Sequence, residues 1–342
     1  AGYHARWVDA GYEALEVERV YRSALWNPAT QAKSRTFEAA GMIDLVARLN
    51  GTFLFDHKTT TLDITDPDSP YWRQLRVEGQ VTHYLLLKWL VAEKLDGAVW
   101  DVTRKPSISP KKLSKGERAS AVADRKYFGR ILSGGDLMAL QTEERETLAM
   151  YEARLAYDCT IERPEWYFQR RPVPRLDHEL LEYAEDLWQH GQNILASRKI
   201  ERLPKNSGAC MLYGSPCKFL GICSGHDSPD SDRWKRREIR HNELGESGRM
   251  DALTNSRIRC FQTCQVKHRF EYELCLERQD EEEKESLWFG SCYHAALNAW
   301  WRTFLVEDNY HVDDSEIGSP TSEVGKHIAE AELSARDSHG GF

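Results

Sequence analysis

The clearest alternation of apolar and polar residues lies early in the chain. Residues 42–49 alternate well enough to predict a β-strand, and Asn50 and Gly51 form a dipeptide that favours a tight hairpin turn. Residues 52–55 are mostly apolar and predict the start of a second strand. This stretch therefore predicts a β-hairpin.

The predicted hairpin carries two acidic residues and a lysine. Asp44 lies on the first strand, and Asp56 and Lys58 lie on the second. Residues two positions apart on a strand share a face, so Asp56 and Lys58 should point the same way. Asp44 can join them across the hairpin.

Periodicity and composition predict the remaining elements, which together indicate an α/β fold with a mixed central sheet flanked by helices. Residues 17–25 suit a strand as well as a helix. Helices are predicted at residues 3–16, 71–94, 142–156, 176–197, 256–278 (with Ser256 as the capping residue) and 287–304. Strands are predicted at residues 36–40, 97–103 and 166–169.

Length and composition limit the class of protein. A chain of 342 residues that is 41% hydrophobic can bury one large core or two modest ones, and we find no internal repeat. No apolar run reaches the length of a membrane span and no signal peptide opens the sequence, so we expect a soluble cytoplasmic protein of prokaryotic or phage origin.

The distribution of charge is more informative than its sum. The formal net charge of -8 argues weakly against a nucleic-acid partner. Residues 104–130, however, hold nine Lys or Arg against Glu117 and Asp124, and Pro106 and Pro110 predict a loop there. A basic loop of this kind could follow a phosphate backbone, or it could be an ordinary solvated loop.

The two carboxylates and the amine of the hairpin predict a metal-dependent site. Paired carboxylates such as Asp44 and Asp56 repel unless a divalent cation lies between them, and their hard oxygens suit Mg²⁺ or Mn²⁺. Protonated Lys58 cannot bind a metal, but it can hold a water or stabilise charge on a phosphate. The alternative is a surface hairpin with an exposed ion pair.

Asp44, Asp56 and Lys58 together resemble the active-site motif of the PD-(D/E)XK nuclease superfamily. Gln80 and Tyr84 follow on a predicted helix, four residues apart and hence on one face. This pair resembles the QxxxY motif of the RecB-type branch, in which these side chains lie beside the active site and contact DNA. The second acid is Asp56 rather than the commoner Glu. The shorter side chain has less reach but carries the same charge.

Three cysteines, Cys210, Cys217 and Cys223, lie within fourteen residues and indicate a metal rather than disulfides in a chain expected to be intracellular. Thiolates favour zinc or an iron-sulfur cluster, and unliganded thiols are the alternative. The segment resembles the C-terminal cysteine cluster of iron-sulfur RecB-family nucleases, which are related to the CRISPR-associated RecB-like nucleases. That resemblance implies a 4Fe-4S cluster, although the first spacing is wider than in those relatives.

The resemblance also implies a distant fourth cysteine and an additional metal-binding histidine. Residues 250–294 resemble the usual opening of RecB-family nuclease domains, which assigns the fourth cluster ligand to Cys264 and a metal-binding role to His294. Cys260 competes with Cys264 because helix register does not separate them, and Cys159 is a weaker candidate.

The expected first part of the domain thus follows its expected last part. We expect an N-terminal helical part at residues 250–342, a nuclease core at 1–205, a cysteine segment at 206–225 and a charged C-terminal tail at 226–249. Circular permutation, fusion of one domain's tail to another's start, or two segments joined in exchanged order would each produce this arrangement. We favour the exchanged order, in which 250–342 precedes 1–249.

The resemblance implies a metal-dependent deoxyribonuclease, with an exonuclease favoured. Asp44, Asp56, His294 and the main-chain carbonyl of His57 would bind Mg²⁺ or Mn²⁺ while Lys58 activates the nucleophile. The expected partners are DNA that is single-stranded or has free ends, and a separate helicase or another recombination or defence protein. The alternatives are a catalytically silent DNA-binding module of the same fold and a phosphohydrolase that acts on nucleotides.

Overall fold

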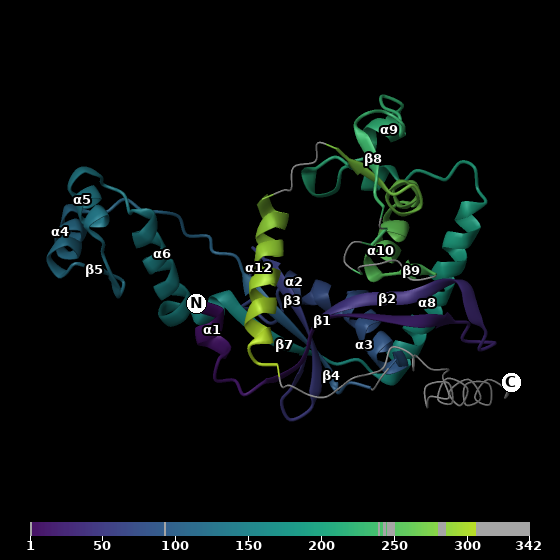
Figure 1. Cartoon of the computed structure of the whole chain (residues 1–342), viewed down its shortest axis with the longest axis horizontal. Coiled ribbons are helices and arrows are strands. Elements are labelled where there is room, and N and C mark those ends of the chain that lie inside the picture. Colours follow the sequence, from purple (N-terminus) through teal and green to yellow (C-terminus); the bar gives the residue numbers. More distant parts are fainter. Residues whose placement is uncertain are drawn as a thin grey trace. The chain divides into compact units, whose positions relative to one another are not determined.

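The computed structural model describes residues 2–91, 94–238, 240–241, 244, 250–279 and 285–305. Figure 1 shows its elements. The strands are β1 (Glu13–Trp26), β2 (Lys33–Arg48), β3 (Thr52–Thr60), β4 (Gly97–Arg104), β5 (Lys126–Tyr127), β6 (Arg130–Ile131), β7 (Phe168–Val173), β8 (Trp234–Arg236), β9 (Asp251–Leu253) and β10 (Leu276–Arg278). The α-helices are α1 (Gly2–Trp7), α2 (Pro70–Arg76), α3 (Gly79–Val91), α4 (Lys115–Asp124), α5 (Gly134–Thr142), α6 (Leu148–Tyr157), α7 (Pro164–Tyr167), α8 (Asp177–Arg198), α9 (Leu220–Ser224), α10 (Asn255–Thr263), α11 (Gln265–His268) and α12 (Glu285–Arg302).

The largest sheet is mixed. Its strand order is β1-β2-β3-β4-β7, and β9 pairs with β2 off this path. β1 and β2 are antiparallel, whereas β9 runs parallel to β2, with Phe37 opposite Asp251 and Ala39 opposite Leu253. The prediction of an α/β fold with a mixed central sheet flanked by helices is therefore confirmed.

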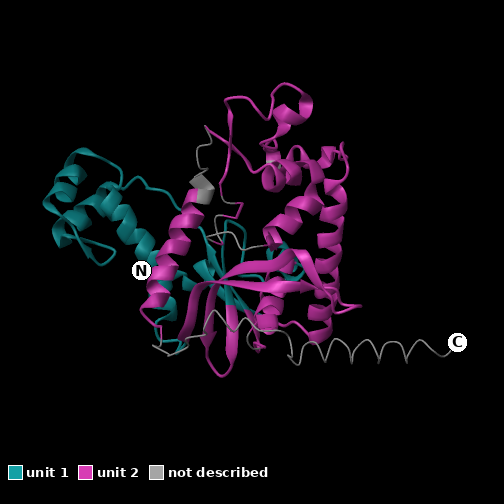
Figure 2. Cartoon of the chain, turned by 45° about the vertical axis from the view of Figure 1, so that its right-hand side comes forward, with its two compact units in different colours: residues 1–12, 55–77, 99–173 teal, residues 13–54, 78–98, 174–342 magenta. Residues whose placement is uncertain are grey.

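The chain divides into two compact units, which Figure 2 colours separately. Unit 1 comprises residues 1–12, 55–77 and 99–173, and unit 2 comprises residues 13–54, 78–98 and 174–342. The boundary falls inside β3, between Leu54 and Phe55. Asp56 and Lys58 thus belong to unit 1, and Asp44 belongs to unit 2.

Helices of unit 2 cover both faces of β2. Helix α3 packs against β1 and β2, and a Cβ built on Gly41 would lie 2.7 Å from Cε1 of Tyr84, so the glycine permits this close approach. Side chains alternate along a strand, so Asp44, three residues further on, points to the opposite face. Helix α12 packs against β1 and brings His294 to Asp44 on that opposite face.

A buried ionic network fixes the later part of unit 2 to the sheet. Arg257 of α10 is fully buried, with 0% of its side chain exposed, and its Nη2 lies 2.7 Å from Oε1 of Glu273. Its Nη1 donates to the carbonyl oxygen of Ala252 on β9 at 3.0 Å. Nε donates to His268 at 3.2 Å, and burial, followed by the charge of Arg257, lowers the pKa of His268 to about 3. A neutral imidazole is therefore the acceptor at neutral pH.

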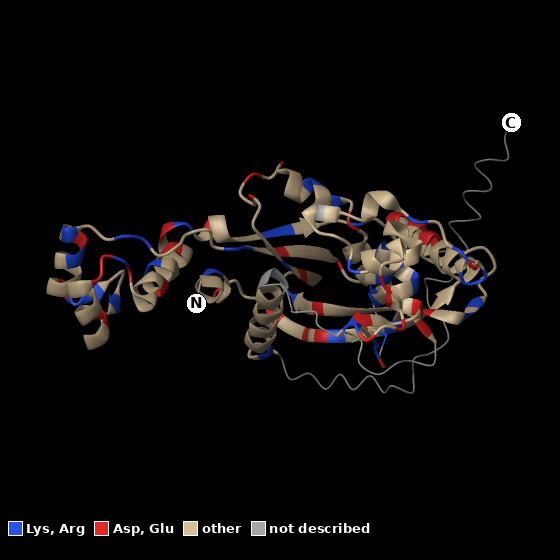
Figure 3. Cartoon of the chain, turned by 90° about the horizontal axis from the view of Figure 1, so that it is seen from above, with Lys and Arg blue, Asp and Glu red and all other residues tan. Residues whose placement is uncertain are grey.

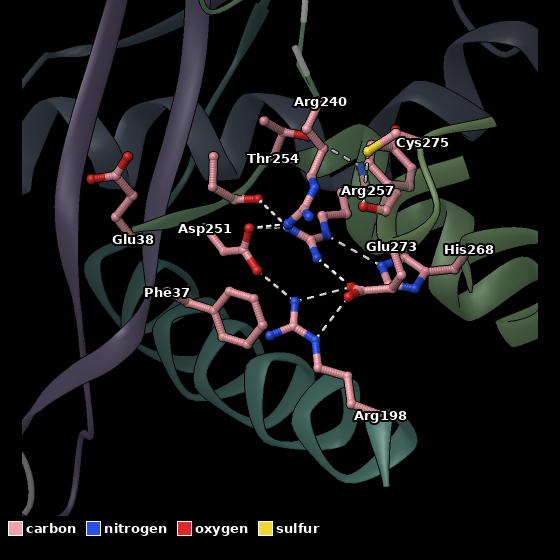
Figure 4. A network of polar contacts seen from close by, with 12 residues as sticks. Phe37, Glu38, Arg198, Arg240, Asp251, Thr254, Arg257, His268, Glu273 and Cys275 are labelled. Atoms are coloured by element: carbon pink, nitrogen blue, oxygen red, sulfur yellow. Dashed lines mark hydrogen bonds and ion pairs between the residues drawn. The ribbon is translucent and has the colours of Figure 1, made fainter. Parts of the chain in front are cut away.

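Two more arginines complete the network. Figure 4 shows Arg198, Arg240 and Arg257 converging on Asp251 and Glu273. Burial alone would raise the pKa of each carboxyl group. The three arginines outweigh burial at Asp251, and Arg198 and Arg257 outweigh it at Glu273. The pKa of each carboxyl group therefore lies below its ordinary value. Buried charges are tolerated when they are paired in this way, and here the pairs join β9, α8 and α10 with the turn that follows α11.

A separate apolar cluster holds the cysteine segment. Phe219, Trp234 and Leu276 are buried together, and Cys217 packs against them. The rings of Phe219 and Trp234 stack with their centroids 5.2 Å apart. The cluster therefore joins the segment between Cys210 and Cys223 to the β8–β10 ribbon.

Unit 1 contains a lobe formed by residues 111–157. Its core consists of Leu113, Ala121, Tyr127, Leu132, Leu140 and Met150. The prediction of a basic loop over residues 104–130 is confirmed around Pro106 and Pro110 but is wrong from Lys115 onward, because α4 and the β5–β6 hairpin form there. Ser114 begins α4 with a reciprocal capping box that includes Glu117, a local signal that the basic composition obscured.

Two predicted helices are broken. The helix predicted at residues 71–94 is divided into α2 and α3, which are separated at Val77 and Glu78, and its residues 92–93 lie outside the described residues. The break occurs because Gly79 disfavours a continuous helix and allows Tyr183 to approach within 3.3 Å of its missing Cβ. The helix predicted from Ser256 to about residue 278 begins after Thr254, whose hydroxyl accepts from the Arg257 amide. It ends at residue 263 because Cys264 is extended.

Some of the remaining predicted elements are confirmed, and others begin or end at different residues. The strand at 97–103, the helices at 176–197 and 287–304 and the hairpin at 42–55 are confirmed within a few residues. The predicted helix at 3–16 ends at Trp7, and residues 13–26 form β1. The strand predicted at 166–169 begins at Phe168, and the helix predicted at 142–156 begins at Leu148. No helix among the described residues is long and apolar enough to cross a membrane.

The buried network predicts an unequal response to two similar substitutions. Glu273→Gln leaves three arginines facing only Asp251, so the free energy of unfolding should fall by about 3–5 kcal/mol. Glu277→Gln removes an exposed carboxylate whose ion pair with Lys235 spans 3.7 Å, and should cost less than about 1 kcal/mol. Urea unfolding of the parent and both variants measures the difference, and equal losses would contradict a special role for the network.

Candidate active site and cysteine segment

The first part of the candidate site lies on β3 in unit 1. Nζ of Lys58 lies 2.7 Å from Oδ2 of Asp56, which confirms that the two side chains share a face of the strand. The Asp56 side chain is only 1% exposed, whereas Lys58 is 23% exposed. Nζ also lies 5.4 Å from the ring centroid of Trp100 on β4. A buried carboxylate is thus held beside a partly accessible ammonium group.

A second buried carboxylate orients the residue between them. His57 Nδ1 lies 3.2 Å from Oδ2 of Asp101, and Nη2 of Arg170 lies 3.2 Å from the same oxygen. The hydroxyl of Tyr3 also donates to this oxygen. Burial would raise the pKa of Asp101, but the charge of Arg170 and the contacts with His57 and Tyr3 hold the pKa well below its ordinary value. Asp101 is therefore an ionised group that fixes the imidazole of His57.

The other predicted acid lies in unit 2. Asp44 lies on β2, and its Oδ2 is 3.9 Å from Nδ1 of His294 on α12. The Asp44 side chain is half-buried and that of His294 is partly exposed. The structure therefore places together two residues that are 250 positions apart in sequence and that only the family resemblance connected.

Gln80 and Tyr84 form a pair on α3, also in unit 2. Nε2 of Gln80 donates to the hydroxyl of Tyr84 at 3.0 Å. The ring of Tyr84 lies against Gly41, on the face of β2 opposite that of Asp44. The two residues thus share one helical face as predicted, and within unit 2 Tyr84 contacts a different face of the strand from Asp44.

Contacts of the buried His83 hold helix α3, which carries this pair, against β2 and α8. His83 donates from Nε2 to the carbonyl oxygen of Ala40 at 3.0 Å, and its Nδ1 lies 3.2 Å from the hydroxyl of Tyr183. Burial lowers the pKa of His83 to about 4, so it is neutral at physiological pH. These two bonds join α3 to β2 and α8.

Lys88 is a buried residue that the sequence analysis missed. It lies one turn beyond Tyr84, and its Nζ contacts Oε1 of Glu16 at 2.7 Å and the hydroxyl of Tyr21 at 2.8 Å. A lysine within an apolar helix was the available signal. Asp101 carried a similar signal as a charged residue inside the apolar run of β4.

The cysteine segment brings four thiols into one region. Burial raises the pKa of Cys223, and the charges of Cys217, Cys264 and Cys210 add to that effect, so each of these three thiols lies within electrostatic range of Cys223. The Cys217 amide donates to the Cys210 carbonyl oxygen at 2.8 Å. The side chain of Asn206 joins this segment to α10 by donating to the carbonyl oxygen of Thr263 at 2.7 Å.

The competing cysteines have other surroundings. Burial raises the pKa of Cys260 to about 12, and the charged groups near it are chiefly those of Lys267, Glu271 and Lys218. Cys159 lies in unit 1, where burial and Asp158 raise its pKa to about 11. Neither thiol shows the set of cysteine neighbours that surrounds Cys223.

The donor types suit the expected groups. Carboxylates with an imidazole suit Mg²⁺ or Mn²⁺, and thiolates suit zinc or an iron-sulfur cluster. Within the described part of the chain, no three His, Cys, Asp or Glu side chains are gathered closely enough to hold a metal ion. The chemistry of the donors therefore fits, while their spacing does not by itself identify a metal.

The Asp101 network predicts a specific pH dependence. A carboxyl group whose pKa is lowered by folding adds stability above its unfolded pKa of about 4, and that stability is lost as the pH falls further toward the folded pKa. Asp101→Asn should reduce the free energy of unfolding by about 3–5 kcal/mol at neutral pH, because Arg170 remains buried.

The variant should also lose less stability than the parent between neutral pH and pH values below 4, which urea unfolding across that range measures. Asp124→Asn, a change at an exposed aspartate of the same unit, should follow the parent curve. Parallel curves for Asp101→Asn and the parent would contradict a lowered pKa at Asp101.

Comparison with known proteins adds one finding. No curated protein and no solved structure matches the chain. Residues 252–338 match the family model described as the PD-(D/E)XK nuclease superfamily. The matched segment includes α10, which carries Arg257, and α12, which carries His294. This segment of the chain is therefore similar to the PD-(D/E)XK nuclease superfamily.

Proposed function

We propose that this chain is a metal-dependent deoxyribonuclease that hydrolyses phosphodiester bonds. The observation that carries the proposal is the buried Asp56 carboxylate held 2.7 Å from the Lys58 ammonium group. The superfamily match at residues 252–338 and the 3.9 Å approach of His294 to Asp44 support it independently. A purely structural ion pair would not require these other residues of the motif.

The proposed metal ligands are Asp44, Asp56, His294 and the main-chain carbonyl of His57. A bound Mg²⁺ or Mn²⁺ would supply Lewis acidity and lower the pKa of a water molecule. The contact of His57 with Asp101 supports this assignment, because it fixes the position of the peptide unit that would present the carbonyl. The low exposure of Asp56 favours cationic partners, and a metal ion would add to the contact that its carboxylate already makes with Lys58.

Lys58 has a different proposed role. Its ammonium group would orient the attacking water or stabilise the charge that develops on the phosphate. The partial exposure of Lys58 allows it to reach a substrate, and Trp100 beneath it limits its rotamers. Loss of Lys58 should therefore reduce the rate of cleavage more than it reduces metal binding.

Gln80 and Tyr84 would contact the DNA strand, as the RecB-type resemblance implies. We propose an exonuclease that acts on single-stranded DNA or on free ends, with a helicase or another recombination, repair, phage-replication or defence protein as its partner. The hydrogen bond between Gln80 and Tyr84 supports a joint role, because it fixes both polar groups on one helical face.

We further propose that Cys210, Cys217, Cys223 and Cys264 hold a 4Fe-4S cluster, with Zn²⁺ as the alternative. The effects of Cys217, Cys264 and Cys210 on the pKa of Cys223 support this set over one that contains Cys260. The cluster would join the end of the cysteine segment to α10 and so stabilise the domain rather than transfer electrons.

The nuclease proposal predicts the loss of cleavage in two variants. End-labelled linear and circular DNA, single- and double-stranded, should be cut by the parent with Mn²⁺ and left intact with EDTA. Asp56→Asn and Lys58→Met should each reduce the rate by about 100-fold or more, because Asp56→Asn removes a charged metal ligand and Lys58→Met removes the positive charge beside the reacting phosphate. Resistance of circular DNA would identify an exonuclease.

Matched controls separate chemistry from folding. Asp124→Asn and Lys199→Met make the same chemical changes at exposed positions and should retain the parent rate. Cleavage that persists in Asp56→Asn would overturn the proposed site. DNA binding without cleavage under every condition would favour a catalytically silent module.

The cluster proposal predicts that metal content follows Cys264. Protein purified without oxygen should contain iron and sulfide, or zinc, and Cys264→Ala should lose most of it. Cys260→Ala and Cys159→Ala should retain it, since neither thiol belongs to the proposed set. Elemental analysis and visible absorption measure the outcome, and unchanged metal content in Cys264→Ala would exclude the proposed fourth ligand.

A further inference from the structure

The β5–β6 hairpin of the lobe places an aromatic side chain in an unusual backbone conformation. Lys126 pairs with Ile131 and Tyr127 pairs with Arg130, which leaves a two-residue turn at Phe128 and Gly129. Both turn residues have positive φ, 44° and 81°, as a type I′ turn requires. Asn, Asp or Gly usually occupies the first of these positions, and a bulky side chain is strained there.

Packing covers only part of the Phe128 side chain. The side chain is 41% exposed, although its ring contacts Tyr127 and Tyr157 at centroid distances of 4.8 and 5.1 Å. Asn or Gly in this turn would make the hairpin more stable than an exposed phenylalanine does. The strained and exposed ring therefore points to a ligand outside the fold.

The base of the hairpin is rigid. The hydroxyl of Tyr127 donates to Oε1 of buried Glu146 at 2.6 Å, and Arg154 binds both oxygens of that carboxylate at 2.6 and 2.7 Å. The Lys111 amide donates to Oε2 at 2.8 Å. Phe128 thus projects from a fixed support, so little conformational entropy would be lost when a ligand contacts it.

Positive charge predominates beside the ring, although Asp124 directly precedes residues 125–131 and Glu152 lies next to them. Arg125, Lys126 and Arg130 belong to the segment 125–131, which contains no acidic residue. Arg130 pairs with Glu152 at 3.0 Å, whereas Arg125 and Lys126 are exposed and form no ion pair with any described residue. Figure 3 shows acidic and basic residues mixed over the rest of the lobe, where Lys111 and Lys112 are paired with carboxylates. At the hairpin, Arg125 and Lys126 therefore remain as exposed cations beside the ring.

We propose that this hairpin binds single-stranded nucleic acid, with a base stacked on Phe128 and the backbone phosphates near Arg125 and Lys126. An exposed aromatic ring between cationic side chains is the combination that recognises an unpaired strand, because every base has a face that can stack and every phosphate is negative. The inference deepens the proposed nuclease function by naming a contact that would hold the substrate strand within unit 1.

Binding is tested without cleavage. Fluorescence anisotropy with a labelled oligothymidylate and EDTA compares the full chain with Phe128→Asn, which suits the type I′ turn and should preserve or raise the melting temperature. The variant should bind about 5- to 100-fold more weakly, as expected for loss of stacking on one base. Its affinity for blunt double-stranded DNA should change little, because paired bases do not expose their faces.

Further variants keep the test decisive. Phe128→Trp should retain binding and Phe128→Leu should lose it, which separates stacking from apolar contact. Lys126→Gln should reduce the salt dependence of binding by about 0.7 in the log-log slope for one lost phosphate contact. Met138→Asn alters an exposed apolar residue elsewhere in the lobe and should bind as the parent does.

Two outcomes overturn the inference. Unchanged oligothymidylate binding in Phe128→Asn and Phe128→Leu would assign the exposed ring to a protein partner. Equal weakening for single- and double-stranded DNA would exclude stacking. Because EDTA prevents metal-dependent cleavage, the binding result is independent of the Asp56→Asn cleavage assay. If the parent cleaves DNA but the Phe128 variants bind oligothymidylate normally, only the hairpin inference is refuted. If the Phe128 variants bind more weakly but the parent does not cleave DNA, only the nuclease proposal is refuted.

Discussion

The ion network around Arg257 is the constraint on which the arrangement of unit 2 depends. A fully buried guanidinium group is tolerated only with partners, and Glu273, Asp251 and the Ala252 carbonyl oxygen supply them. Asp251 and Ala252 belong to β9, which pairs with β2. The strand that carries Asp44 and the helix that carries Arg257 are therefore held in one unit by charge pairing that neither could satisfy alone.

This constraint bears on the unusual order of the segments. The superfamily match begins at residue 252, after the hairpin and the cysteine segment in sequence. In the structure, residues 251–253 pair with residues 37–39, and α12 packs against β1, so the late and early segments form one sheet-and-helix unit. Permutation, fusion and exchanged order all remain compatible with that pairing. The junction that would separate them includes residues 245–249, which lie outside the described residues.

Local signals predicted some elements well because the information lies within a few residues. Asn50 and Gly51 specified the hairpin turn, and alternation placed Asp56 and Lys58 on one face. The break between α2 and α3 was missed because the apolar spacing continues across it, while Gly79 is required by contacts with the distant Tyr183 and Asn255. Periodicity reports the face of a helix but not such tertiary contacts.

In the candidate site too, local sequence patterns predicted some features and missed those that depend on tertiary contacts. Asp44 and His294 were connected only by the family resemblance, since no local pattern relates residues so far apart, and the structure places them 3.9 Å apart. Asp101 and Lys88 were missed because a charged residue within an apolar run is visible in the sequence, whereas its partners Arg170 and Glu16 are not. The net charge of the chain does not describe how charge is distributed within the lobe. Lys111, Lys112 and Arg130 are paired with carboxylates, whereas Arg125 and Lys126 form no ion pair with any described residue.

The central claim is that Asp44, Asp56 and His294 bind one catalytic metal ion. Anomalous diffraction at the manganese absorption edge, from crystals of the parent grown with Mn²⁺, tests it most directly. The account predicts one strong peak in contact with a carboxylate oxygen of Asp44, a carboxylate oxygen of Asp56 and a ring nitrogen of His294, and no peak there in crystals of Asp56→Asn. A manganese ion bound elsewhere, or none at these residues in well-ordered crystals, would contradict the account.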